Sequence, residues 1–347
     1  MKTDYIIVGC GLAGISFCEE LKAKNKTFVV FDNNSQQSST VAGGMYNPVI
    51  LKRFTGVWKS KEQLELALPI YSKIEKDLNQ QFDYKIPVHR LFNNIQEQNK
   101  WFTASDKPNL SDYLSTTLLK STNPNINAPF GYGEVLQTGR VDTKKLVSAY
   151  RKDLANKNLL ITEAFNYNEL KTEDNKVTYK NREAKHIIFA EGYGLKSNPF
   201  FKELPLEGLK GELITIKAPD LKLNEVIKSS VFIMPLGNDL YRIGATFDRD
   251  NKDNKITENG KAQLIKKLKP LLNCTFEVVN HTAGIRPTVS DRRPLVGTHK
   301  TLKNHHILNG LGTRGVMIAP YVSKALFNAI ENNIALDEEI DISRFNN

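Results

Sequence analysis

The segment spanning residues 4–32 constrains the fold more than any other part of this chain of 347 residues. Residues 5–8 form an apolar run of the kind that becomes a fully buried strand, and a helical pattern follows them. A second apolar run, residues 28–31, ends at Asp32. Between the first run and the helix stand three glycines in the spacing G-x-G-x-x-G. Strand, glycine turn, helix, strand and acid in this order are the context that a dinucleotide-binding unit requires.

The three glycines, Gly9, Gly11 and Gly14, have separate physical roles. They allow a tight turn, a close approach of backbone to a pyrophosphate, and close packing of the helix on the strand. The free N–H groups and the positive dipole end of the helix N-terminus favour phosphate. Asp32 stands where a carboxylate accepts hydrogen bonds from ribose hydroxyls. Glycines alone would also fit an ordinary turn, but with both strands and the acid they predict a dinucleotide site.

The charge balance leaves two interpretations open. Lys and Arg total 48 against 38 Asp and Glu, a net charge of +10 that is compatible with an anionic partner such as nucleic acid. The lysines are spread along the chain, however, which is typical of an ordinary soluble surface. A basic amphipathic helix predicted over residues 256–272 has the same two interpretations, a nucleic-acid face or a solvated face.

The sequence indicates neither a metal site nor a membrane segment. Cys10, Cys18 and Cys274 contain no C-x-x-C pair, and the six histidines are scattered without metal-ligand spacing. No apolar stretch is long enough to span a bilayer, and the first strand begins almost at the N-terminus, which leaves no room for a signal peptide. We therefore expect a cytoplasmic protein with no metal and no membrane partner.

The order of apolar runs predicts an α/β fold with two interleaved domains. Rossmann-like strands are predicted near residues 4–8, 28–32, 159–163, 186–190 and 306–309, with antiparallel-looking strands in the intervals. We predict a Rossmann-like nucleotide-binding domain made of residues 1–50, 139–205 and 284–347. The second domain, residues 51–138 and 206–283, is predicted to be α+β and built on an antiparallel sheet. Pro69 should kink the helix predicted near residues 58–78 or start a new segment.

Other glycine turns follow the first one. Residues 41–48 combine small residues with two adjacent glycines, which suggests backbone passing close to a flat ligand. A flexible linker is the alternative, although Met45 and Tyr46 are too apolar for a good one. A predicted strand ends at Glu191-Gly192, and the last strand breaks in the glycine-rich turn 309–315 before a closing helix. An NAD-dependent dehydrogenase would not account for this last turn.

These motifs, in this order, resemble the family of FAD-dependent amino-acid and amine oxidases that includes D-amino-acid oxidase, glycine oxidase and sarcosine oxidase. The resemblance covers nearly the whole chain and implies a glutathione-reductase-like FAD-binding domain. The most specific segment is Gly284-Ile285-Arg286-Pro287, followed by residues 310–320. Glu191 departs from the family pattern, which has a small residue there. In the family, the last glycine turn opens a helix whose N-terminus points at the flavin ring.

The resemblance implies FAD as the cofactor and assigns residues to it. The FAD-binding residues that it implies are Gly9, Gly11, Leu12, Ala13, Gly14, Asp32, Asn33, Thr40, Gly43, Gly44, Met45, Phe165, Ala190, Glu191, Gly192, Gly312, Thr313, Arg314, Gly315, Val316 and Met317. Sarcosine-oxidase-like members attach the flavin through a cysteine just after the counterpart of Gly-x-Arg. This chain has no cysteine there, so we expect non-covalent FAD.

Arg286 is the residue that we expect to hold the substrate. A guanidinium pairs with a planar carboxylate through two parallel hydrogen bonds, which fixes the direction of the Cα–H bond. A surface ion pair is the alternative, but the apolar neighbours of Arg286 disfavour it, and the family places its carboxylate clamp here. Phe232 stands where glycine-oxidase-like enzymes tend to carry a tyrosine, so we expect Tyr241 or Tyr46 to supply that hydroxyl.

The expected function is therefore oxidation of a C–N bond beside a carboxylate, in an amino acid or an N-substituted glycine. Hydride transfer to flavin N5 and hydrolysis of the imine would complete the reaction. A closer resemblance, through residues 45–48 and 311–315, is to the oxidase domain of the bifunctional enzyme that makes 5-methylaminomethyl-uridine in tRNA. It implies a carboxymethylaminomethyl group on a wobble uridine as an alternative substrate, with tRNA as a possible partner. A non-catalytic flavin-binding module is the second alternative.

Overall fold

The first strand, β1 (Lys2–Val8), lies inside an eight-stranded sheet, in a computed structural model that describes residues 1–173 and 176–345. It pairs in parallel with β2 (Phe28–Phe31) on one side and with β14 (Arg182–Phe189) on the other. The parallel part continues through β11 (Leu160–Ile161) beside β2 and β21 (His305–Asn309) beside β14. The Rossmann-like arrangement of these five strands is therefore confirmed.

Helices with apolar faces cover this sheet and share one core with it. They are α1 (Leu12–Ala23), α3 (Ser60–Leu78), α5 (Thr143–Asn156) and α7 (Gly315–Asn332). The Asp142 side chain accepts a hydrogen bond from the Lys145 N–H and caps α5. Antiparallel strands complete the sheet: β12 (Leu170–Glu173), β13 (Lys176–Tyr179) and β20 (Leu295–Thr298).

The helix α3 bears on two predictions. It runs through Pro69 without ending, so no new segment starts there. It also packs against α7, and the Tyr71 hydroxyl donates to the Val316 carbonyl over 2.8 Å. Residues 60–78 therefore belong to the first core and not, as predicted, to the second domain, because their apolar face packs in the core that α7 shares with the first sheet.

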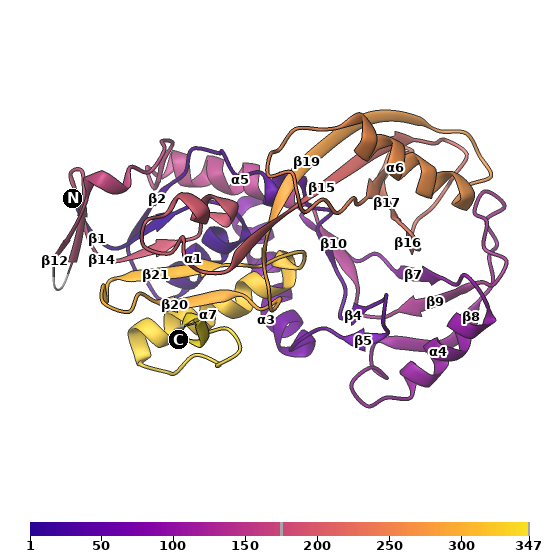
Figure 1. Ribbon diagram of the computed structural model, residues 1–347, viewed down its shortest axis with the longest axis horizontal. Coiled ribbons are helices and arrows are strands. Elements are labelled where there is room, and N and C mark those ends of the chain that lie inside the picture. The colour runs from indigo at the N-terminus through magenta and orange to yellow at the C-terminus, as the bar shows by residue number, and fades with distance from the viewer. Residues whose placement is uncertain (174–175, 346–347) are drawn as a thin grey trace.

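The second domain is a mostly antiparallel eight-stranded sheet beside the first domain (Figure 1). Its strands, in spatial order, are β19 (Glu277–Val289), β15 (Leu206–Lys217), β18 (Leu240–Gly244), β17 (Phe232–Gly237), β16 (Val226–Lys228), β7 (Val88–Leu91), β9 (Tyr132–Val135) and β8 (Leu114–Leu119). The helices α4 (Ile95–Ser105) and α6 (Glu258–Leu268) pack on it. Short elements near the junction are α2 (Ser38–Val41), β3 (Met45–Tyr46), β4 (Val49–Ile50), β5 (Thr55–Gly56), β6 (Asp83–Tyr84) and β10 (Gly139–Val141).

The two longest strands, β15 and β19, pair along their whole length and connect the domains. At one end Leu206 and Val289 lie in the core of the first sheet, whereas Ile214 and Ile216 lie in the core of the second. The predicted boundary at residue 284 falls inside β19, and the one at residue 206 coincides with the start of β15, so this ladder joins residues assigned to different domains. Residues 174–175 and 346–347, which the predicted first domain includes, lie outside the described part of the chain.

Candidate functional site

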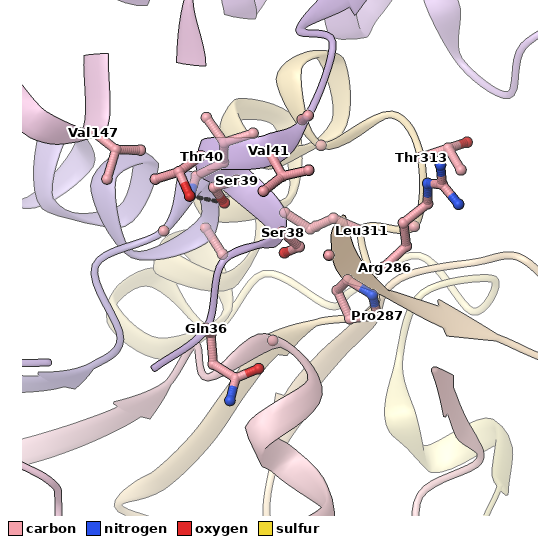
Figure 2. Close-up of a pocket in the computed structure, with 18 of the residues that line it drawn as sticks. Gln36, Ser38, Ser39, Thr40, Val41, Val147, Arg286, Pro287, Leu311 and Thr313 are labelled. Atoms are coloured by element: carbon pink, nitrogen blue, oxygen red, sulfur yellow. Dashed lines mark hydrogen bonds between the residues drawn. The ribbon is translucent and has the colours of Figure 1, made fainter. Parts of the chain in front are cut away.

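A cavity of about 680 Å³ extends from the glycine turn after β1 to the wall formed by β15, β17 and β19. In Figure 2, Gln36 and Val147 lie at one side of it, and Arg286 and Thr313 lie at the other. The lining comes from segments far apart in the sequence, which the two sheets bring together. Carboxyl ends of parallel strands form one part of the wall, where open α/β sheets place their ligands.

Gly9, Gly11 and Gly14 follow β1 and form a turn that we call the glycine cradle. A Cβ on Gly9 would lie 2.4 Å from the carbonyl oxygen of Ala190, and the φ of +106° at Gly9 disfavours any side chain. A Cβ on Gly14 would lie 2.0 Å from the carbonyl oxygen of Gly9, so helix and strand touch through backbone. Gly14 itself does not line the cavity. The Leu12 N–H, at the start of α1, donates to the Ser39 hydroxyl over 3.1 Å.

Asp32 is held at the end of β2 in an orientation that faces the cavity. Its carboxylate accepts hydrogen bonds from the backbone N–H groups of Cys10 and Asn34. It also forms an ion pair with Arg151 of α5, which lines the same cavity. Arg151 is 119 residues away in sequence, so no local pattern could have identified it.

Glu191 follows β14 and is buried beside the glycine cradle. Its carboxyl accepts hydrogen bonds from the Tyr167 hydroxyl and, over 2.7 Å, from the Asn198 amide. Burial raises the pKa of Glu191 to about 7, against the opposing effect of these two hydrogen bonds. The residue that departs from the family pattern is therefore an acid that is half neutral near pH 7.

Arg286 lies at the opposite end of the cavity, on β19. Its guanidinium lies directly over Gly211 of β15, where a Cβ would come within 2.0 Å of a guanidinium nitrogen. The ring centroid of Phe247 lies 5.0 Å from its central carbon, and its Nη1 donates to the Thr246 carbonyl over 3.3 Å. Burial lowers the pKa of Arg286 to about 10, so it is charged at neutral pH. No carboxylate pairs with it among the described residues, which leaves its remaining N–H groups free for a ligand.

Two more cations line the same cavity, Lys228 at the end of β16 and Arg314 in the turn before α7. Burial, reinforced by the positive charges of Arg90, Arg286 and Arg314, lowers the pKa of Lys228 to about 8. Burial and the charge of Arg292 also lower the pKa of Arg314. Neither side chain forms an ion pair within residues 1–173 and 176–345.

Both tyrosines that we expected at the substrate lie outside the cavity lining. Tyr241 points to the opposite face of the second sheet, where its hydroxyl accepts from the Leu223 N–H over 3.3 Å. Tyr46 is buried in the first core, and its hydroxyl donates to Asp83 over 2.8 Å. The prediction of either hydroxyl at the substrate is therefore wrong, because each is directed away from the cavity and used elsewhere.

Most of the residues predicted to bind the cofactor line this cavity. They are Gly9, Gly11, Leu12, Ala13, Asp32, Asn33, Thr40, Gly43, Gly44, Met45, Phe165, Ala190, Glu191, Gly192, Gly312, Thr313, Arg314, Gly315 and Val316. Met317 is an exception, since its side chain is buried in the first core. Sequence reasoning missed Gln36, Ser39, Arg151 and Lys228. Gln36 and Ser39 had a local signal, since both lie in the polar loop that follows Asp32.

The cavity fits an elongated dinucleotide whose reactive ring reaches the second sheet. The glycine cradle and the start of α1 can receive phosphates, and Asp32 can receive ribose hydroxyls. Gly43 approaches the second sheet so closely that a Cβ there would lie 3.2 Å from the Phe232 ring. Residues 42–45 and the turn 312–315 line the same cavity as Arg286 and Lys228.

No helix in the described residues is both long enough and apolar enough to cross a membrane. Within the same residues, no three His, Cys, Asp or Glu side chains gather as ligands for a metal ion.

Known structures share this fold. Glycine oxidase from Geobacillus kaustophilus superposes with a TM-score of 0.81 over 97% of both chains, at 18% identity. Iminodiacetate oxidase from Chelativorans superposes with a TM-score of 0.78 over 97% of this chain and 98% of that one, at 15% identity. These identities are low, so the likeness concerns the fold.

Curated relatives match shorter segments. The tRNA 5-methylaminomethyl-2-thiouridine biosynthesis bifunctional protein MnmC of Campylobacter jejuni is 30% identical over 32% of this chain, and the match spans only 18% of MnmC. Glycine oxidase of Bacillus subtilis is 26% identical over 43% of this chain and 42% of its own length.

The family match is the most extensive of the sequence comparisons. The model described as DAO, FAD dependent oxidoreductase, matches residues 4–329. This range includes nearly all of both sheets and every residue of the cavity discussed above. The chain therefore belongs to the DAO family of FAD-dependent oxidoreductases, and its cofactor is FAD.

Proposed function

We propose that this protein oxidises the C–N bond of an amino acid or an N-substituted glycine, and that Arg286 holds the carboxylate beside that bond. The supporting observation is a half-buried guanidinium over Gly211 that lines the cavity without a carboxylate partner among the described residues. A buried charge without a partner is costly, which makes an anionic ligand the natural complement. The likeness to glycine oxidases is consistent with this assignment.

The side chains of this wall orient the substrate and exclude water. FAD, when bound, supplies the acceptor for the hydride that leaves the carbon beside nitrogen. Arg286 fixes the carboxylate, and Phe232 and Met234 line the adjoining wall. Among the described cavity residues between 206 and 289, no acidic side chain or histidine is present. A substrate amine that arrives neutral needs no such base, since nitrogen's lone pair forms the imine as the hydride leaves; water then hydrolyses the imine.

Anaerobic mixing of the FAD-loaded protein with matched amines tests the proposal. The flavin absorbance should bleach with an amino acid or N-substituted glycine and not with its decarboxylated counterpart, for example with N-methylglycine and not with dimethylamine. Equal bleaching by both members of a pair would remove the carboxylate from the proposal. If no amine in a broad panel reduces the flavin, the protein is a flavin-binding module without this activity.

A second candidate substrate is the carboxymethylaminomethyl group on a tRNA wobble uridine, itself an N-substituted glycine. The matches to MnmC and the net charge of +10 favour it. Mass spectrometry of wobble nucleosides from a deletion strain should then show accumulated carboxymethylaminomethyl-uridine. Unchanged levels would count against tRNA while leaving the small-molecule reaction intact.

Glu191 should make the stability of the protein depend on pH. Its folded-state pKa of about 7 lies above the ordinary value of 4.5, so ionisation opposes folding. The free energy of unfolding should fall as the pH rises from about 4.5 to 7, by up to about 3 kcal/mol. Glu191→Gln should flatten this slope in urea unfolding at a series of pH values. The exposed Glu203→Gln is the control, and an unchanged slope in Glu191→Gln would contradict the assignment.

A further inference from the structure

Lys228 is a cation that the proposed carboxylate clamp does not use. It is the last residue of β16, it lines the cavity, and its ammonium nitrogen lies 5.4 Å from the ring centroid of Phe232. Its ammonium has neither an acceptor nor an ion-pair partner among the described residues. Arg90, on the neighbouring strand β7, is different because it pairs with Glu97.

Several cations that are removed from solvent have carboxylate partners, although Arg242 of β18 forms no ion pair among the described residues. Lys210, which is 1% exposed, pairs with Asp253 over 2.6 Å. Arg151 pairs with Asp32, and Arg140 pairs with Asp142. Three cations that line the cavity have no carboxylate partner among the described residues: Lys228, Arg286 and Arg314. They lie near one another, since the positive charges of both arginines help to lower the pKa of Lys228.

A single carboxylate cannot neutralise the three positive charges of Lys228, Arg286 and Arg314. Two parallel hydrogen bonds from Arg286 satisfy a single carboxylate. Arg314 belongs to the turn before α7, in the segment predicted to face the flavin ring. Lys228 therefore remains for a different negative charge, on the side of the cavity lined by Phe232.

We propose that Lys228 binds a second carboxylate of the substrate, so that the preferred substrate is an amino acid or N-substituted glycine that carries two carboxylates. This inference rests on the proposed function, since it takes the first carboxylate to be held by Arg286. The second one lies on the substituent that points away from the reacting carbon. Lys228 is then the residue that separates dicarboxylates from substrates with one carboxylate.

The protonation of Lys228 gives this preference a pH dependence. Below a pKa of about 8 the side chain is a cation and attracts the second carboxylate; above it the amine is neutral and the attraction is lost. The charged groups that face it are the arginines Arg90 from β7, Arg286 from β19 and Arg314 before α7. The extra affinity for a dicarboxylate should therefore disappear as the pH rises through this range. A bound anion raises the pKa of Lys228, so the loss occurs at a correspondingly higher pH in the complex.

Calorimetric titration of the FAD-loaded protein with glutarate and pentanoate tests the inference, because these ligands share a five-carbon chain and differ in one carboxylate. At pH 7 glutarate should bind about tenfold more tightly. Lys228→Met should remove the difference and leave pentanoate affinity unchanged. Lys217→Met, an exposed lysine at the end of β15, should keep it. Lys228→Arg should preserve the preference up to pH 9.5, where the wild-type protein loses it.

Two outcomes overturn the inference. Equal affinities in the wild-type protein, or a glutarate preference that survives in Lys228→Met, would each remove Lys228 from the substrate site. If pentanoate still binds in those cases and Arg286→Ala abolishes its binding, the proposed function stands without the second carboxylate. If neither acid binds and no amine bleaches the flavin, both fall together.

Discussion

Arg286→Ala should leave FAD bound and lower kcat/KM for a carboxylate-bearing amine by two to three orders of magnitude. Removing one partner of a buried, hydrogen-bonded charge pair costs roughly 3–4 kcal/mol, which corresponds to about this factor in rate. The substrate would also lose the orientation of its Cα–H bond. Stopped-flow bleaching of the flavin measures the effect directly. The control is Arg182→Ala, at the start of β14 and outside the cavity, which should react as the wild-type protein does.

Gly211→Ala tests the same clamp without removing its charge. The added methyl group would lie 2.0–2.2 Å from three guanidinium atoms, so the side chain of Arg286 must leave its position. We expect a loss of carboxylate affinity of about tenfold or more, with FAD still bound. Gly56→Ala is the matched control because its Cβ would make only ordinary contacts, the nearest at 3.5 Å. Normal turnover in both Arg286→Ala and Gly211→Ala would exclude the guanidinium from the reaction.

The other large effect is expected for Gly14→Ala, which should abolish FAD binding. The new Cβ would stand 2.0 Å from the Gly9 carbonyl oxygen and 3.1 Å from its carbon. Backbone atoms cannot rotate aside as a flexible side chain can, so α1 must move away from β1. That movement displaces the helix N-terminus from the phosphates and loosens the core, at a cost of about 3 kcal/mol in the free energy of unfolding.

Two measurements check the Gly14 prediction. The amount of flavin released on denaturation gives the FAD content per chain, and urea unfolding gives the stability. Gly56→Ala should behave as the wild-type protein in both. A Gly14→Ala protein with full FAD content and an unchanged unfolding midpoint would show that the helix and strand do not need this close contact.

The sequence allowed good predictions where the signal is local. The strand–turn–helix–strand unit at residues 4–32 and the Asp142 cap depend on neighbours within a few residues, and the structure confirms both. We missed α4 although its signal is of the same kind. The Asn94 side chain caps this helix by accepting from the Glu97 N–H, and the Asn-x-x-Glu spacing could have revealed it.

The site was harder to predict because its geometry depends on long-range pairing. The alternation of side chains along a strand predicts that Tyr241 and Ile243 share a face. Both lie in the core on the face of the sheet that is turned away from the cavity. Both faces of this sheet are covered by apolar cores, so the sequence of β18 does not say which one meets the cofactor. Lys228 is a single polar residue at a strand end, and only the packing of β16 beside β17 brings it to the cavity.

The ladder between β15 and β19 determines how the molecule can open. Leu206 pairs with Val289 in the first core and Ile216 pairs with Val278 at the second, so the same row of backbone hydrogen bonds is anchored in both domains. A hinge rotation would have to break these bonds. Amide hydrogens along the ladder should therefore exchange with solvent only when the whole protein unfolds. The distance from Arg286 to the glycine turn after β1 should then change little when ligands bind. Phe247, which lines the cavity and is 67% exposed, is a side chain that can move as they enter.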